Sequence, residues 1–108
     1  NNKIISYITD CEYITGAPSE KLIKFSDNSD LLIHDAHFTP KDLTNHKGWG
    51  HSSWEQAVLM AQKSNSKQLA LFHYSPNYND KKIQSIEKNA MQRFEQTIAA
   101  KQGLVIYL

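Results

Sequence analysis

The sequence is short of cysteine, of net charge and of long apolar runs, and each shortage excludes a class of protein. Cys11 is the single cysteine, so no internal disulfide can form, and we expect a reducing compartment such as the cytoplasm. Twelve basic and eleven acidic residues give a net charge of +1, which argues against a dedicated nucleic-acid patch or an anionic-membrane binder. No apolar run approaches the roughly 20 residues that span a bilayer, and no signal-peptide pattern opens the chain, so no membrane partner is expected.

What the sequence does contain is a set of short apolar runs that each end in a residue able to bind metal or move a proton. Strands are predicted at residues 3–9, 31–34 and 69–73. Asp10 follows the first strand, Asp35 follows the second, and His73 closes the third. The carboxyl ends of parallel strands share one rim, where open α/β sheets bind their ligands. His51 follows a glycine-containing loop and directly precedes a helix, so we expect it near the same rim.

Helix signals alternate with these strands. A short helix is predicted over residues 20–25. Thr39 can cap the next helix, and Pro40 suits its first position because the missing N–H would have no partner there. Ser53 and Gln56 have the spacing of a capping box, which predicts a further helix start.

The longest helix is predicted after residue 79. Asp80 is expected to cap it and Gly103 to end it, with residues 104–108 as a final strand. Its apolar stripe consists of Ile83, Ile86, Ala90, Phe94 and Ile98.

This alternation predicts an α/β layer of largely parallel strands in one domain, residues 1–108. The strands are apolar at consecutive positions, so both faces of the sheet need cover. The predicted helices can cover only one face, which indicates an incomplete fold. We expect the bare face to promote self-association, because contiguous apolar surface rarely stays solvated.

Each candidate site residue has a simpler interpretation beside the functional one. Asp10 can be a turn carboxylate that accepts backbone N–H bonds, and His73 can be a half-buried imidazole with its bonds satisfied. His51 can cap its helix or face solvent, or it can pair with Asp35 as an oriented acid/base unit.

The segment from His34 to His37 could be a metal motif, because it reads His-Asp-x-His. Strand alternation, however, sends His34 to the face opposite Asp35 and His37, so we do not expect His34 to be a ligand.

Four ordered motifs resemble the second half of metallo-β-lactamase-fold hydrolases, in the ribonuclease Z and phosphodiesterase-like branch. They are residues 7–10 (Tyr-Ile-Thr-Asp), 33–38 (Ile-His-Asp-Ala-His-Phe), 50–53 (Gly-His-Ser-Ser) and 71–76 (Leu-Phe-His-Tyr-Ser-Pro). In that branch Asp10 matches an aspartate that bridges two metal ions, and His73 matches a histidine of the second metal site. Asp35 and His51 match segments that supply an acid/base pair, with Asp in place of the branch's Glu.

The resemblance implies the carboxy-terminal half of an αβ/βα sandwich, with the first half absent. The branch's principal metal motif, His-x-His-x-Asp-His, does not occur in this sequence. The resemblance implies that the complete protein is a metal-dependent hydrolase with two zinc ions or a similar divalent pair. It is expected to cleave phosphodiester or other ester bonds of a small substrate through a metal-activated water. Catalytic zinc usually takes three protein ligands, so this chain alone is expected to hold metal weakly or not at all and to be inactive.

Two other classes remain open at this point. A non-catalytic interaction or sensory module would also keep the fold without the first-half motif. A phospho-receiver domain also places aspartates at strand ends. Such a domain requires a lysine at the end of a late strand, where this chain has His73, and Lys67 lies before that strand.

Overall fold

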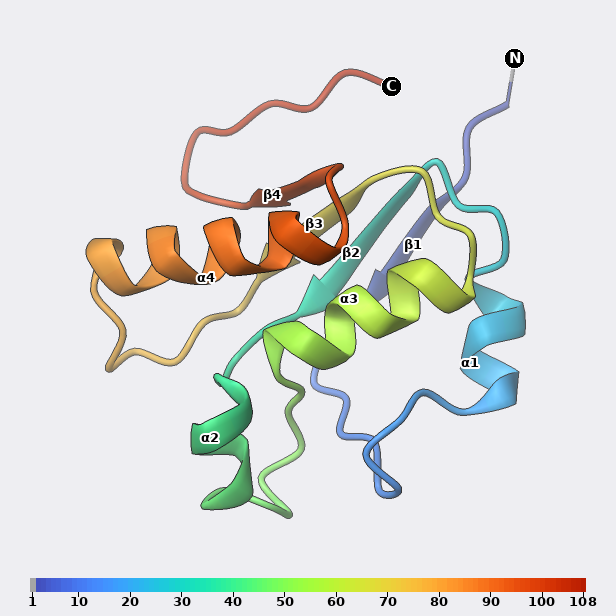
Figure 1. Ribbon diagram of the computed structural model, residues 1–108. Coiled ribbons are helices and arrows are strands. Elements are labelled where there is room, and N and C mark those ends of the chain that lie inside the picture. Colours follow the sequence, from blue (N-terminus) through green and yellow to red (C-terminus); the bar gives the residue numbers. More distant parts are fainter. Residues whose placement is uncertain (1) are drawn as a thin grey trace.

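A single parallel sheet with helices on one side forms the structure, a computed structural model that describes residues 2–108. The strands are β1 (Ile5–Ile8), β2 (Leu31–Asp35), β3 (Leu69–Phe72) and β4 (Thr97–Ala99). They pair in the order β1-β2-β3-β4, and every pair is parallel (Figure 1). The helices are α1 (Glu20–Phe25), α2 (Pro40–Thr44), α3 (Trp54–Lys63) and α4 (Asp80–Arg93). The predicted α/β class and strand pairing are confirmed.

Local capping explains where the helices begin. Thr39 caps α2 by accepting a hydrogen bond from the backbone N–H of Asp42, and Pro40 takes the first helical position. At α3 the Ser53 hydroxyl accepts from the Gln56 N–H while the Gln56 side chain accepts from the Ser53 N–H. The predicted capping box is therefore confirmed, and it fixes the chain immediately after His51.

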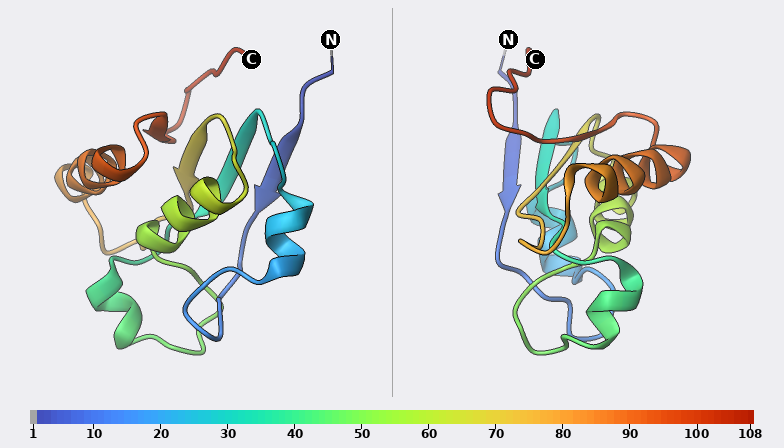
Figure 2. Two further views of the ribbon diagram at one scale, coloured as in Figure 1. Left: turned by 45° about the vertical axis from the view of Figure 1, so that its right-hand side comes forward. Right: turned by 90° about the vertical axis from the view of Figure 1, so that its left-hand side faces the viewer.

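The core lies between the sheet and α3 and α4. The edge-on view in Figure 2 shows these two helices on the same side of the strands. The largest fully buried apolar side chains of the core come from both the strands and the helices: Leu32, Leu69, Leu71, Val58, Met60 and Ile86. No helix among residues 2–108 is long and apolar enough to cross a membrane.

No helix of residues 2–108 lies over the other face of the sheet. Along β1 the buried and exposed residues alternate, so that Ile8 joins the core while Ile5 and Tyr7 are 55% and 58% exposed. The Tyr7 ring packs on that of Phe72 from β3, with centroids 5.2 Å apart. The sequence-based expectation that the helices cover only one face is confirmed.

The prediction for the chain after residue 79 is wrong in three respects. Asn79, not Asp80, caps α4, and its side chain accepts from the Lys82 N–H at 2.8 Å. The helix ends at Arg93, not near Gly103. Residues 104–108 form no strand with any part of the chain that the structure describes.

The edge of β3 explains the early end of α4. The backbone of β3 needs partners on that side, and the next segment supplies them: the Leu69 N–H donates to Gln96 and the Ala100 N–H donates to Leu71. Ile98 therefore lies in β4 opposite Ala70, although it continues the helical stripe by spacing. With this edge occupied by β4, residues 104–108 have no β3 edge to join.

Candidate metal and acid/base site

The strand ends bring the predicted residues together. Asp10 lies two residues beyond β1, Asp35 ends β2, and His73 directly follows β3, with Asp35 in register with Phe72. Asp10 and His73 have φ values of 49° and 61°, in the left-handed region that non-glycine residues seldom adopt. Backbone conformations of this kind cluster at functional sites.

The Asp35 carboxylate is fully buried and is held by the backbone of three segments. Its Oδ1 accepts from the N–H groups of His37 and Ser52, at 3.1 and 3.2 Å, and its Oδ2 accepts from the Asp10 N–H at 3.2 Å. A buried carboxylate is costly unless its oxygens are hydrogen-bonded. These bonds therefore stabilise it and tie together the loops that follow β1 and β2 and the loop that precedes α3.

The same carboxylate also orients two imidazoles. Asp35 Oδ2 lies 2.9 Å from His51 Nδ1 and 3.1 Å from His73 Nδ1. A carboxylate oxygen accepts, so both Nδ1 atoms carry the hydrogen and both Nε2 atoms keep a free lone pair. This is the arrangement by which a carboxylate usually fixes the tautomer of a metal-binding or acid/base histidine.

Asp10 completes the cluster from the solvent side. Its side chain is 67% exposed, and its Oδ1 lies 3.7 Å from His73 Nδ1 and 3.9 Å from His51 Nδ1. One ligand atom from each of Asp10, Asp35, His51 and His73 falls within 4.8 Å of the others. Because Asp35 already accepts five N–H bonds, the donors best placed for a divalent cation are the carboxylate of Asp10 and the imidazoles, which suits zinc. The expectation that these four side chains converge is met, while their roles stay predictions.

His37 is a site residue that sequence reasoning did not select. Its ring stacks on that of His51, with centroids 4.1 Å apart and planes at 11°, and its Nδ1 donates to the backbone carbonyl of His73 at 2.9 Å. Burial, and then the charge of His51, lower the pKa of His37. The sequence feature that could have identified His37 is its position two residues beyond Asp35, which places both side chains on the same face of the strand.

His34 lies away from the site, as its position in the strand indicated. It is fully buried, its Nδ1 donates to the Asp35 carbonyl at 2.8 Å, and its Nε2 accepts from the Tyr13 hydroxyl at 2.6 Å. Burial lowers the pKa of His34, because the charged imidazole would lose its hydration. This histidine belongs to the core.

The sequence profile of the Beta-lactamase superfamily domain matches residues 1–74 of the chain. Curated relatives include "Ribonuclease Z" of Azobacteroides pseudotrichonymphae, 37% identical over 87 residues, and "Ribonuclease Z" of Sulfurisphaera tokodaii, 42% identical over 83 residues. The matches cover 81% and 77% of this chain but only 29% and 27% of those proteins. The chain thus spans less than a third of the length of these relatives.

Solved structures show the same likeness in three dimensions. The metallo-beta-lactamase fold protein YhfI from Bacillus subtilis superposes with a TM-score of 0.72 and 26% identity, over 93% of this chain and 38% of that one. The short form of human tRNase Z gives a TM-score of 0.65 and 25% identity, over 93% of this chain and 32% of that one. The four-stranded sheet is thus a fragment of the metallo-β-lactamase fold.

Proposed function

Because the chain belongs to the β-lactamase superfamily, we propose that it forms part of a metal-dependent hydrolase that cleaves phosphodiester bonds of nucleic acids. The observation that carries the proposal is the buried Asp35 carboxylate, which orients the imidazoles of His51 and His73 beside an exposed Asp10. The likeness to proteins named ribonuclease Z and tRNase Z supports the choice of substrate class.

In this proposal Asp10 and His73 hold divalent metal, most simply two zinc ions shared with ligands from elsewhere in the protein. Bound metal of this kind lowers the pKa of a water molecule and polarises a phosphoryl oxygen. The donor set fits, since a carboxylate and a neutral imidazole with a free Nε2 are both zinc ligands.

His51 is the acid/base residue. Its Nδ1–H is held by Asp35, which leaves Nε2 directed away from the buried carboxylate and available to the leaving oxygen. Asp35 stabilises the positive charge that the imidazole carries while it holds a second proton. Its three backbone hydrogen bonds hold the carboxylate in position.

We further propose that an amino-terminal half supplies the remaining metal ligands and covers the bare face of the sheet. Two observations support this partner: Ile5 and Tyr7 are exposed on that face, and the chain spans under a third of its relatives. The lone, half-buried Cys11 fits a reducing compartment such as the cytoplasm.

The test is a phosphodiesterase assay of the intact protein with zinc, on an oligoribonucleotide and on bis(p-nitrophenyl) phosphate. We expect turnover that a chelator abolishes and that added metal restores. Metal-loaded intact protein that cleaves no phosphodiester would contradict the proposal and favour a non-catalytic module with this fold.

A further inference from the structure

An exposed tryptophan lies in the loop that leads to the acid/base histidine. Trp49 lies two residues before His51 and is 64% exposed, although tryptophan is usually well buried. Its ring meets that of His46 at 4.6 Å, with planes at 88°, and that of the buried Phe38 at 6.4 Å. The Phe38 ring in turn lies 6.2 Å from the His51 ring, centroid to centroid, so Phe38 lies between Trp49 and the site.

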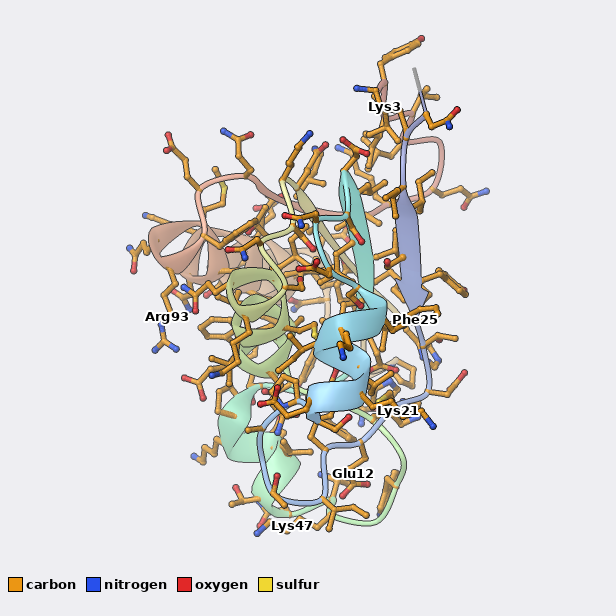
Figure 3. All side chains as sticks on the ribbon, turned by 90° about the vertical axis from the view of Figure 1, so that its right-hand side faces the viewer. Lys3, Glu12, Lys21, Phe25, Lys47 and Arg93 are labelled. Carbon is orange, nitrogen blue, oxygen red and sulfur yellow. The ribbon has the colours of Figure 1, made fainter. Side chains whose placement is uncertain are left out.

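The loop that carries Trp49 is fixed by one carboxylate. Glu12 accepts from the Gly48 N–H at 2.8 and 3.0 Å and from the Gly50 N–H at 2.8 Å. Figure 3 shows Glu12 at the same end of the molecule as Lys47, the residue that precedes this loop. Because Glu12 is two residues from Asp10, this contact ties the Trp49 loop to the site.

The flanking glycines make this presentation possible. Gly48 and Gly50 have φ values of 89° and 85°, which other residues adopt only with strain. The two N–H groups on either side of Trp49 therefore both reach the Glu12 carboxylate. The loop is held in place from both sides of the tryptophan, so little conformational freedom remains to be lost when a ligand packs on the indole.

We propose that Trp49 is a specificity residue that stacks against a nucleobase adjoining the scissile phosphodiester. The inference rests on the proposed function and adds the part of the substrate that this loop recognises. Every nucleobase offers a flat π-face, and a base on an aromatic side chain strengthens binding by about 10- to 100-fold. An exposed indole on a loop whose backbone is held by hydrogen bonds, two residues from the acid/base histidine, is suited to that contact.

The experiment compares two substrates with the same leaving group in the intact, zinc-loaded protein. One is thymidine 5′-(p-nitrophenyl phosphate), and the other is methyl p-nitrophenyl phosphate, which lacks the base. We expect Trp49→Ala to raise KM for the nucleoside substrate about 10- to 100-fold with little change in kcat. KM for the methyl substrate should change less than about twofold, and Trp49→Phe should restore most of the loss, since it keeps a ring.

A matched control is Phe25→Ala, which removes another exposed aromatic ring at the end of α1 (Figure 3). It should alter neither KM. Equal effects of Trp49→Ala on both substrates, or none on either, would overturn the proposal, because Trp49 would then pack against protein or serve no binding role.

A binding measurement separates this inference from the proposed function. Calorimetry with thymidine 5′-monophosphate and with methyl phosphate needs no turnover. If the wild type cleaves neither substrate, but Trp49→Ala selectively weakens binding of the nucleotide, then the proposed function fails and the stacking role stands. If the variant binds the nucleotide as tightly as the wild type does, the stacking role is overturned whatever the turnover.

Discussion

The Asp35 carboxylate lies 2.9 Å from the His51 imidazole, Oδ2 to Nδ1. The same oxygen holds His73, so one buried group orients both the proposed acid/base residue and a proposed metal ligand. The backbone bonds from Asp10, His37 and Ser52 make this carboxylate a structural centre as well. Changes at Asp35 should therefore affect folding and chemistry together.

Asp35→Asn should destabilise the chain by about 2–4 kcal/mol. The amide oxygen can still accept from His37 and Ser52. The amide nitrogen, however, would face three donors that Oδ2 now satisfies: the Asp10 N–H and the Nδ1–H groups of His51 and His73. Denaturant unfolding of the variant and the wild type measures the difference. The matched control is Asp10→Asn, whose exposed side chain should cost less than about 0.5 kcal/mol. A control as damaging as Asp35→Asn would contradict this account.

His51→Ala in the intact protein should lower kcat by about 100- to 10,000-fold while metal content stays unchanged. The reason is that His51 is expected to move a proton without binding metal. His73→Ala is the contrasting variant, since removal of a ligand should lower the metal content itself. Metal analysis beside steady-state kinetics distinguishes the two, and loss of metal from His51→Ala would make His51 a ligand.

The parts of the fold that could be predicted from the sequence are those set by residues close together in the chain. The bounds of α1 and the Thr39 and Ser53 caps are set by side chains within a few residues of each other. The positions of β1, β2 and β3 likewise follow from short apolar runs. The end of α4 is set by the distant backbone edge of β3, which needs β4 as a partner. No local spacing contains that information, so the helical stripe misleadingly included Ile98.

The site likewise has a part that the sequence predicts and a part that depends on contacts between distant segments. Strand ends predicted that Asp10, Asp35 and His73 share a rim, and the position of His51 before a helix suggested its pairing with Asp35. The resemblance matched the same two residues to an acid/base pair. The stacking of His37 on His51 and the contact between Glu12 and the Trp49 loop arise from tertiary packing between separate loops. The near-neutral charge argued against a dedicated nucleic-acid patch, whereas recognition by single stacked rings needs no such patch.

The isolated chain should hold zinc weakly and should show no hydrolase activity. Of the predicted metal ligands it supplies only Asp10 and His73, and catalytic zinc usually takes three protein ligands. Dialysis of the purified chain against metal-free buffer, followed by elemental analysis, tests this. Stoichiometric zinc after dialysis would contradict the expectation, and loss of that zinc in His37→Gln would identify His37 as the additional ligand.

The bare face of the sheet should cause the isolated chain to self-associate. Ile5→Lys places a charge on the exposed face of β1 and should shift the chain toward monomer in sedimentation velocity. The control is Ile14→Lys, because Ile14 is almost fully exposed but lies in the loop after β1. A wild-type chain that sediments as a monomer, or equal effects of both variants, would contradict a role for this face.

Acid should destabilise the fold through His34. The folded state lowers the pKa of His34 below its usual 6.5, so the unfolded chain binds more protons as the pH falls below that value. His34 therefore costs no stability above about pH 6.5, and the free energy of unfolding should fall below it, by at most about 1.4 kcal/mol per pH unit for one proton. The variant His34→Gln tests this, because it removes the titrating group and supplies an amide that can still bond to Tyr13. The variant should be less stable at pH 8 but should lose stability less steeply between pH 6.5 and 5, by urea unfolding at each pH. His37, whose pKa is also lowered, should leave a residual slope. Equal slopes in the two proteins would show that His34 is not a source of the acid sensitivity.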